Sequence, residues 1–210
     1  MANLELGDTR LILAECAKAG LLRNQAAYVL ATAFWETART MRPVREYGGE
    51  TYLRTKKYYP YVGMGYVQLT WKANYEKAGR KLGVDFVKNP KLLLEPRYAA
   101  PILVAGMKDG WFTGRKLADY ITLQKSDFTS ARRIVNGTDK AATIAAIARE
   151  YDAALRTEGY GVDKPATSPA DLEKPAPSGS PSTKNDKAAV GIFTLVLAAL
   201  GAAAVFIFGD

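Results

Sequence analysis

The chain has 210 residues, of which 48% are hydrophobic and 24% are charged, as expected for a folded domain with additional segments. It has no histidine and one cysteine, Cys16, which excludes histidine-dependent triads, histidine-based zinc sites and an internal disulfide. The formal charge is +8, and the first 160 residues hold 25 basic against 16 acidic side chains. Such a basic domain favours an anionic partner (nucleic acid, a lipid surface or an acidic wall polymer), with solubility as the plain alternative.

The N-terminal segment predicts two helices and no signal peptide, because acidic residues come early and no long apolar run follows. Asp8 or Thr9 is expected to cap a helix that ends at Gly20. Asn24 is expected to cap a second, amphipathic helix that ends at Glu36.

Residues 39–67 are rich in Gly, Tyr and Arg and lack a helical period, which indicates loop and short strands. Helices are then predicted over 71–82, 96–108, 127–135 and 139–157. Pro101 should bend or split the second of these. No βαβ alternation is present, so the fold class is mainly α.

The last fifty residues differ in composition from the rest. Residues 161–187 contain five of the ten prolines and no aromatic residue, which predicts a disordered linker. Residues 188–209 carry no charge over 22 positions, enough as a helix for a hydrocarbon core of ~30 Å. The predicted organisation is therefore a domain over 1–160, a linker, and a transmembrane helix that anchors the protein in a membrane.

Two carboxylates are candidate acid–base groups, since glycoside hydrolysis needs two carboxylates and a groove but no histidine. Glu36 follows Phe34 and Trp35, whose apolar bulk would favour the protonated form that a general acid needs. Glu46 follows Arg45, which would favour the ionised form that a general base needs. Glu50 is the reserve candidate, and surface charge is the alternative for all three.

An aromatic stretch follows these carboxylates. Its polar members Gln68, Thr70 and Asn74 are interleaved with aromatic rings, as in a groove that holds a sugar chain. Gly63 and Gly65 permit the close or unusual backbone of a groove wall. The aromatic residues of this stretch are Tyr58, Tyr59, Tyr61, Tyr66, Trp71 and Tyr75.

The segments WETA, MRPVREYGG and GMGYVQLTWKANY, in this order, resemble the catalytic core of glycoside hydrolase family 19, which contains chitinases and phage-type endolysins. The hallmarks of that family are a helix that ends in HET and a later GRG(P/Y)(I/V)QL(S/T)xxxNY. GWFTGRKLADYI and ARRIVNG are similar to its bacterial and phage branch. The resemblance covers residues 10–158 and implies a lysozyme-like helical domain in which a small loop and strand region lines a cleft.

The resemblance implies roles for individual residues. Glu36 matches the general acid and Glu46 the base that activates water in an inverting reaction. The matched substrate-binding positions are Tyr66, Gln68, Thr70, Asn74 and Asn136. Trp35 stands in place of the family's histidine and Met64 in place of its arginine, so contacts made by those two side chains are not carried over.

The expected activity is hydrolysis of β-1,4 bonds in a polymer that contains N-acetylglucosamine, peptidoglycan before chitin, without a metal or organic cofactor. The alternative from another class is a tail-anchored wall-binding or virion structural protein without catalysis. Nucleic acid is not expected as a partner because no nucleic-acid-binding motif is found. Lys184 and Lys187 before the apolar run would keep the domain in the cytoplasm under the positive-inside rule.

Overall fold

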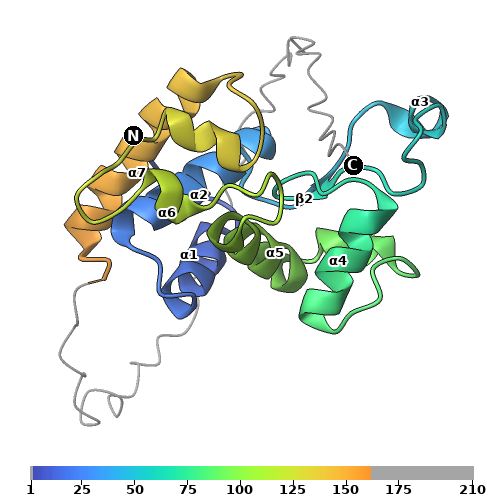
Figure 1. Ribbon diagram of the computed structural model, residues 1–210, viewed down its shortest axis with the longest axis horizontal. Helices are drawn as coiled ribbons and strands as arrows, with labels where there is room; N and C mark the ends of the chain where they lie inside the picture. The colour runs from blue at the N-terminus through green and yellow to red at the C-terminus, as the bar shows by residue number, and fades with distance from the viewer. Residues whose placement is uncertain (1, 162–210) are drawn as a thin grey trace, which may run out of the picture. The chain divides into compact units, whose positions relative to one another are not determined.

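The computed structural model describes residues 2–161, which form a mainly helical domain (Figure 1). Its elements are α1 (Thr9–Lys18), α2 (Arg23–Glu36), β1 (Val44–Arg45), α3 (Gly49–Arg54), β2 (Met64–Gly65), α4 (Lys72–Leu82), η1 (Pro90–Leu94), α5 (Pro96–Asp109), α6 (Leu117–Tyr120), η2 (Ser130–Ile134) and α7 (Ala141–Glu158). The linker predicted over 161–187, beyond Gly161, and the membrane segment predicted over 188–209 lie outside the described residues. Within the described residues, no helix combines the length and apolarity needed to cross a bilayer.

Helix α2 forms the centre of the core. Its residues from Asn24 to Ala33 are all buried, and α7, α1 and α5 pack around it. The prediction of an amphipathic helix with one buried face is therefore wrong. Alanine at 26, 27 and 31 provides the short side chains that let neighbouring helices approach on several sides.

The start of α2 also differs from the prediction. The helix begins at Arg23, and Asn24 lies within its first turn rather than at its cap. The Asn24 amide nitrogen donates to the carbonyl of Thr122 and the hydroxyl of Ser126, at 2.8 Å each. Gln25 completes the helix start, because its side-chain oxygen accepts the Leu22 backbone N–H at 3.1 Å.

The other long helices agree with the predicted ranges within about two residues, as expected where apolar residues recur at helical spacing. Helix α5 runs unbroken through Pro101, because this proline lies early in the helix and removes only the hydrogen bond to the Arg97 carbonyl. The helix predicted over 127–135 is only the 3₁₀ turn η2. The short helices α3 and α6 were not predicted.

The region over 39–67 has the predicted loops and short strands. β1 and β2 pair antiparallel, with Val44 opposite Gly65 and Arg45 opposite Met64. Gly65 has a φ of 87°, which a residue with a side chain rarely adopts. A Cβ on Gly63 would lie 2.8 Å from the side-chain oxygen of Gln68, so a larger residue here would displace that amide.

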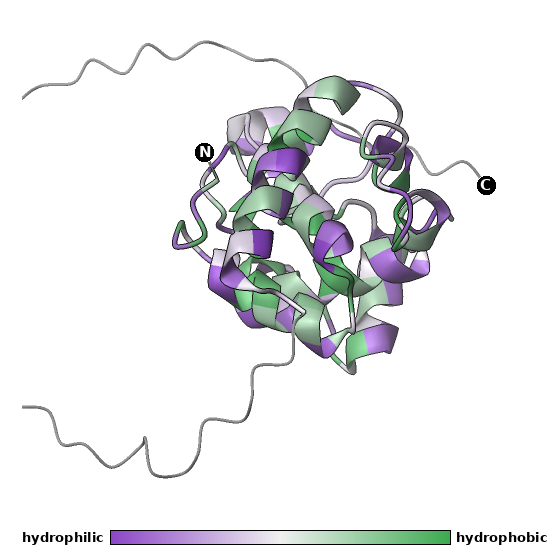
Figure 2. Cartoon of the chain, turned by 90° about the vertical axis from the view of Figure 1, so that its left-hand side faces the viewer, coloured by the Kyte–Doolittle hydropathy of each residue, from purple (hydrophilic) through white to green (hydrophobic). Residues whose placement is uncertain are grey.

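The helical part of the molecule is here defined as α1, α2, α5, α6, α7 and η2, and one buried core runs through it and on into the strand part. The strand part is defined as β1, α3, β2 and α4, and β2 is joined to the helical part through η1, which also packs on α5. Figure 2 shows that single helices carry both hydrophilic and hydrophobic residues, as packing on one side requires. Cys16 is fully buried as a free thiol among these apolar side chains.

Candidate active site

Glu36 is the last residue of α2, and its carboxylate forms a buried ion pair. Arg132 of η2 places Nη1 2.6 Å from Glu36 Oε1. The Glu36 side chain is only 8% exposed and the Arg132 side chain only 3%. Glu36 Oε2 accepts no hydrogen bond from the described residues, so one oxygen is fixed by the guanidinium and the other is left for a ligand.

Arg132 was not identified from the sequence. Its guanidinium is held twice, because Nε also donates to the Asp139 carbonyl at 3.1 Å. The motif ARRIVNG was noted for its asparagine, whereas its second arginine is the buried one. No sequence signal distinguished Arg132 from the adjacent Arg133, because only the packing of η2 on the rest of the domain buries one of them.

The environment expected for Glu36 is only partly present. The Phe34 ring packs edge-on against Tyr151 at a centroid distance of 6.3 Å. The group in contact with the Glu36 carboxylate is the guanidinium of Arg132. The sequence analysis named only Phe34 and Trp35 as neighbours of this carboxyl and did not include its charged partner.

Glu46 directly follows β1 and is held by the loop that precedes β2. Its Oε1 accepts the Tyr58 hydroxyl at 2.6 Å and its Oε2 accepts the Gly63 backbone N–H at 2.9 Å. The Glu46 backbone N–H donates to the Gly63 carbonyl at 2.7 Å. A carboxylate has about four acceptor sites, so both oxygens of Glu46 keep a lone pair for water.

Tyr58 is the donor that orients Glu46. Burial raises the pKa of the Tyr58 phenol, and the hydrogen bond to the Glu46 carboxylate raises it further. The phenol therefore stays protonated at neutral pH and donates to the carboxylate. Its ring is held by Trp71, with the two centroids 5.4 Å apart in an edge arrangement.

Glu50, the reserve candidate, belongs to an exposed cluster on α3. The Tyr59 hydroxyl donates to it at 2.6 Å and Arg45 at 2.8 Å, and both hydrogen bonds lower the pKa of the Glu50 carboxyl. Arg54 lies 3.6 Å away. Arg45 is thus the partner of Glu50 rather than of Glu46, contrary to the prediction from their adjacency.

Gln68, Thr70 and Asn74 form a chain of hydrogen bonds next to Glu46. The Gln68 amide donates to the Val44 carbonyl at 2.9 Å and ties the loop to β1. The Thr70 hydroxyl donates to the Gln68 carbonyl at 2.8 Å, and the Asn74 amide donates to the Thr70 carbonyl at 2.7 Å. Gln68 and Thr70 therefore hold the loop, while the side-chain oxygen of Asn74 accepts no hydrogen bond from the described residues.

Tyr66 is placed differently from the prediction. Its side chain is fully buried, and its hydroxyl donates to Asp8 at 2.8 Å. A side chain without exposed surface does not touch a polymer, so the expectation that Tyr66 lines a substrate groove is wrong in this conformation. Its contact with Asp8, the residue before α1, instead anchors the strand part to the helical part.

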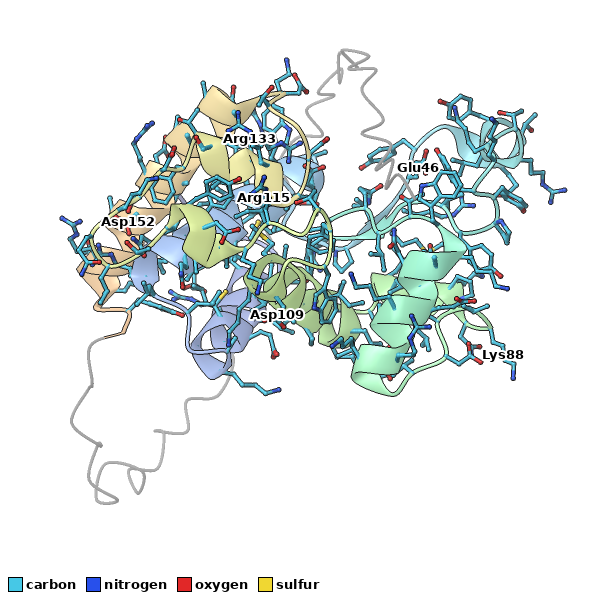
Figure 3. The ribbon with its side chains drawn as sticks, in the orientation of Figure 1. Glu46, Lys88, Asp109, Arg115, Arg133 and Asp152 are labelled. Carbon is cyan, nitrogen blue, oxygen red and sulfur yellow. The ribbon has the colours of Figure 1, made fainter. Side chains whose placement is uncertain are left out.

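Asn136 lies one turn after Arg132. Its backbone N–H donates to the Arg132 carbonyl at 3.0 Å, and its side-chain oxygen accepts the Gly137 N–H at 2.8 Å. Its amide nitrogen has no acceptor among the described residues, and the side chain is half-buried. The site residues thus fall into two groups. The Glu36 group consists of Glu36, Arg132 and Asn136, and the Glu46 group consists of Glu46 and the loop over 58–74. Figure 3 shows Glu46 in the strand part.

Backbone strain gathers in the segments that carry these two groups. Within residues 2–161, a positive φ at a residue other than glycine occurs at Ala38, Arg39, Met41, Gln68, Trp71 and Lys140. Three follow Glu36, two lie in the QLTW segment, and Lys140 follows the carbonyl that Arg132 binds. Each such residue costs ~1–3 kcal/mol, and strain of this kind clusters at functional sites.

A surface depression of about 370 Å³ lies elsewhere, at the end of α4 and the loop that follows it. Its lining residues are Tyr75, Glu76, Gly79, Arg80, Gly83, Val84, Asp85, Phe86 and Val87. None of the predicted site residues is among them. We assign the candidate site to the carboxylates, because strained backbone and buried charge occur there and not around this depression.

Comparison of the chain with protein family models, with curated proteins and with solved structures finds no match. Among residues 2–161, no group of three or more potential metal ligands is found.

Proposed function

We propose that this protein is a lysozyme-like glycoside hydrolase that cleaves β-1,4 bonds in glycans containing N-acetylglucosamine, with peptidoglycan as the first substrate. The observation that carries the proposal is the buried Glu36–Arg132 pair at the end of the central helix. Burying two charges is costly. A buried pair in which one carboxyl oxygen has no hydrogen bond from the described residues supports a functional role for that carboxyl.

Glu36 acts as the general acid in this proposal. Arg132 holds Oε1 and so fixes the orientation of the carboxyl group. In the proposed reaction Oε2 takes up a proton from water as the glycan binds and then gives it to the glycosidic oxygen. Proton transfer to the leaving oxygen allows the bond to the anomeric carbon to break. Arg132 is a positioning residue here, because it acts through Glu36.

Glu46 acts as the base on the attacking water. Tyr58 and the Gly63 N–H fix its two oxygens, and their remaining lone pairs accept a proton from water. Attack from the face opposite Glu36 inverts the anomeric centre, as the family resemblance implies. Asn74 and Asn136, each with an unpaired amide atom, are the side chains best suited to hold the sugar.

Chitin is the second candidate substrate, because it shares the β-1,4-linked N-acetylglucosamine unit. A tail-anchored wall-binding or virion structural protein remains the alternative from another class. It would keep the fold and bind glycan but release no product.

The experiment is product analysis with the full-length protein on purified peptidoglycan and on chitin oligomers. Mass spectrometry should detect new soluble fragments that carry a free reducing end. Glu36→Gln should lower the rate by ~10²–10⁴-fold while the circular dichroism spectrum is unchanged. Glu50→Gln, in which an exposed carboxylate is changed in the same way, is the matched control. Absence of fragments on both polymers would contradict the proposal, as would a Glu36→Gln rate within about threefold of wild type.

A further inference from the structure

Two exposed arginines from distant parts of the chain are brought together beside the Glu36 group. The Thr113 hydroxyl lies 2.6 Å from the Arg133 carbonyl oxygen and 3.0 Å from that of Ile134. Its oxygen also accepts the Arg115 backbone N–H at 3.3 Å. The loop before α6 is therefore docked on η2, and Figure 3 shows Arg115 and Arg133 in the same region of the helical part.

Neither guanidinium is neutralised. Among the described residues, Arg115 and Arg133 form no ion pair, whereas Arg10, Arg23, Arg45, Arg54 and Arg97 all do. The nearby carboxylates are engaged elsewhere: Asp119 accepts the Lys116 backbone N–H, and Asp127 accepts the Ser130 N–H and pairs with Lys125.

The position of Arg133 relates this charge to the candidate active site. It is the immediate neighbour of Arg132, which is buried against Glu36, so one residue of the turn faces the carboxyl and the next faces solvent. A glycan bound at Glu36 would bring the substituents of its sugar rings toward this exposed face. A guanidinium binds a carboxylate through two parallel hydrogen bonds, which makes arginine well suited to acidic substituents.

We propose that Arg115 and Arg133 form an anion-binding surface that takes the carboxylates of the stem peptides of peptidoglycan. The inference rests on the proposed glycosidase function and specifies its substrate class. Chitin carries no charged substituent, so this surface favours peptidoglycan. Nucleic acid is the competing polyanion, but the helical part has no recognised nucleic-acid-binding motif.

The test is a binding measurement that does not need turnover. The full-length Glu36→Gln protein is sedimented with insoluble peptidoglycan, with the same material after enzymatic removal of the stem peptides, and with chitin. Adding Arg115→Gln and Arg133→Gln should weaken binding to intact peptidoglycan by about tenfold, as expected for the loss of two exposed ion pairs. Binding to the stripped glycan and to chitin should not change.

The matched control adds Arg80→Gln and Lys91→Gln, which remove two exposed cations at α4 and η1 that form no ion pair with another residue of 2–161. This control should bind all three polymers as before. Equal losses on the three polymers, or no loss on intact peptidoglycan, would overturn the inference. So would an equal loss of binding to duplex DNA, because the surface would then be a general polyanion site. The two proposals can fail separately. If the wild-type protein releases no fragments, the proposed hydrolysis fails. If the arginine variant nevertheless loses binding to intact peptidoglycan and not to stripped glycan or chitin, the anion-binding surface stands.

Discussion

Two neighbouring tyrosines hold two different carboxylates in this protein. The Tyr58 hydroxyl donates to Glu46 and the Tyr59 hydroxyl to Glu50, both at 2.6 Å. Tyr58 is nearly buried, whereas Glu50 and its partners lie at the surface. The pair therefore offers a matched comparison between the proposed base and an exposed charge cluster.

Tyr58→Phe should lower the catalytic rate by about tenfold, because Glu46 then keeps only the Gly63 N–H as a donor and no longer has a fixed orientation. The free energy of unfolding should fall by ~1–3 kcal/mol, the cost of removing a hydrogen bond to a charged group. Rate measurements and thermal unfolding on the same preparations test both. Tyr59→Phe is the control and should keep the wild-type rate. Equal rates for the two variants would mean that Tyr58 does not position a catalytic group.

Arg132→Leu should destabilise the protein strongly. It leaves the Glu36 carboxylate buried without a partner, a change that costs ~3–5 kcal/mol in the free energy of unfolding. Arg133→Gln, at the exposed neighbouring position, should stay within ~0.5 kcal/mol of wild type. Urea unfolding curves measure both changes. A loss under 1 kcal/mol for Arg132→Leu would show that Glu36 finds water or another donor.

At the residue scale, sequence reasoning reached the two carboxylates but not their partners. Glu36 and Glu46 were identified from their motifs, whereas Arg132 lies 96 positions after Glu36 in the chain. Adjacency was misleading for Arg45, which pairs with Glu50 five residues later rather than with its neighbour. Tyr66 was assigned to substrate binding as a matched position of the GMGYVQLTWKANY segment, but an aromatic ring in a motif serves the core equally well.

Helix α2 shows what close packing demands of an element. Ala31 is fully buried in it, and α2 makes its main contact with α7. Ala31→Leu should lower the free energy of unfolding by ~1–3 kcal/mol, because the added carbons have no space. Ala142→Leu, at an exposed position of α7, makes the same chemical change and should be nearly neutral. If both variants unfold at the wild-type temperature, α2 is packed more loosely than described here.

The long helices α1, α4, α5 and α7 could be predicted because the helical spacing of apolar residues repeats over several turns in each of them. α3 and α6 are too short for such a pattern, and contacts with the rest of the molecule determine them. The prediction for α2 was correct in extent and wrong in character. Its apolar positions continue around the helix, and only the packing of three other helices explains why.

On the scale of the whole molecule, the uncharged run over 188–209 remains a prediction of a membrane anchor. Full-length protein should sediment with membranes and resist extraction by alkaline carbonate. Replacing Val196 and Leu200 by Asp should release it, because a charge at the centre of a membrane helix costs ~2.5–3.5 kcal/mol per residue. If the wild-type protein is recovered in the supernatant at high salt without detergent, the anchor does not exist.

The central claim is that Glu36 and Glu46 act as acid and base across a glycosidic bond, and azide rescue tests it most directly. In Glu46→Ala, azide needs no deprotonation and can attack from the face opposite Glu36. Azide should therefore restore part of the rate on soluble glycan fragments and give a glycosyl azide of inverted configuration, identified by proton NMR. Glu36→Ala should not be rescued, because the leaving oxygen still lacks its proton, and Glu50→Ala should resemble wild type. The account would be contradicted if Glu50→Ala were inactive and rescued by azide while Glu46→Ala kept its activity. It would also be contradicted if Glu46→Ala and Glu50→Ala each lowered the rate by less than about tenfold.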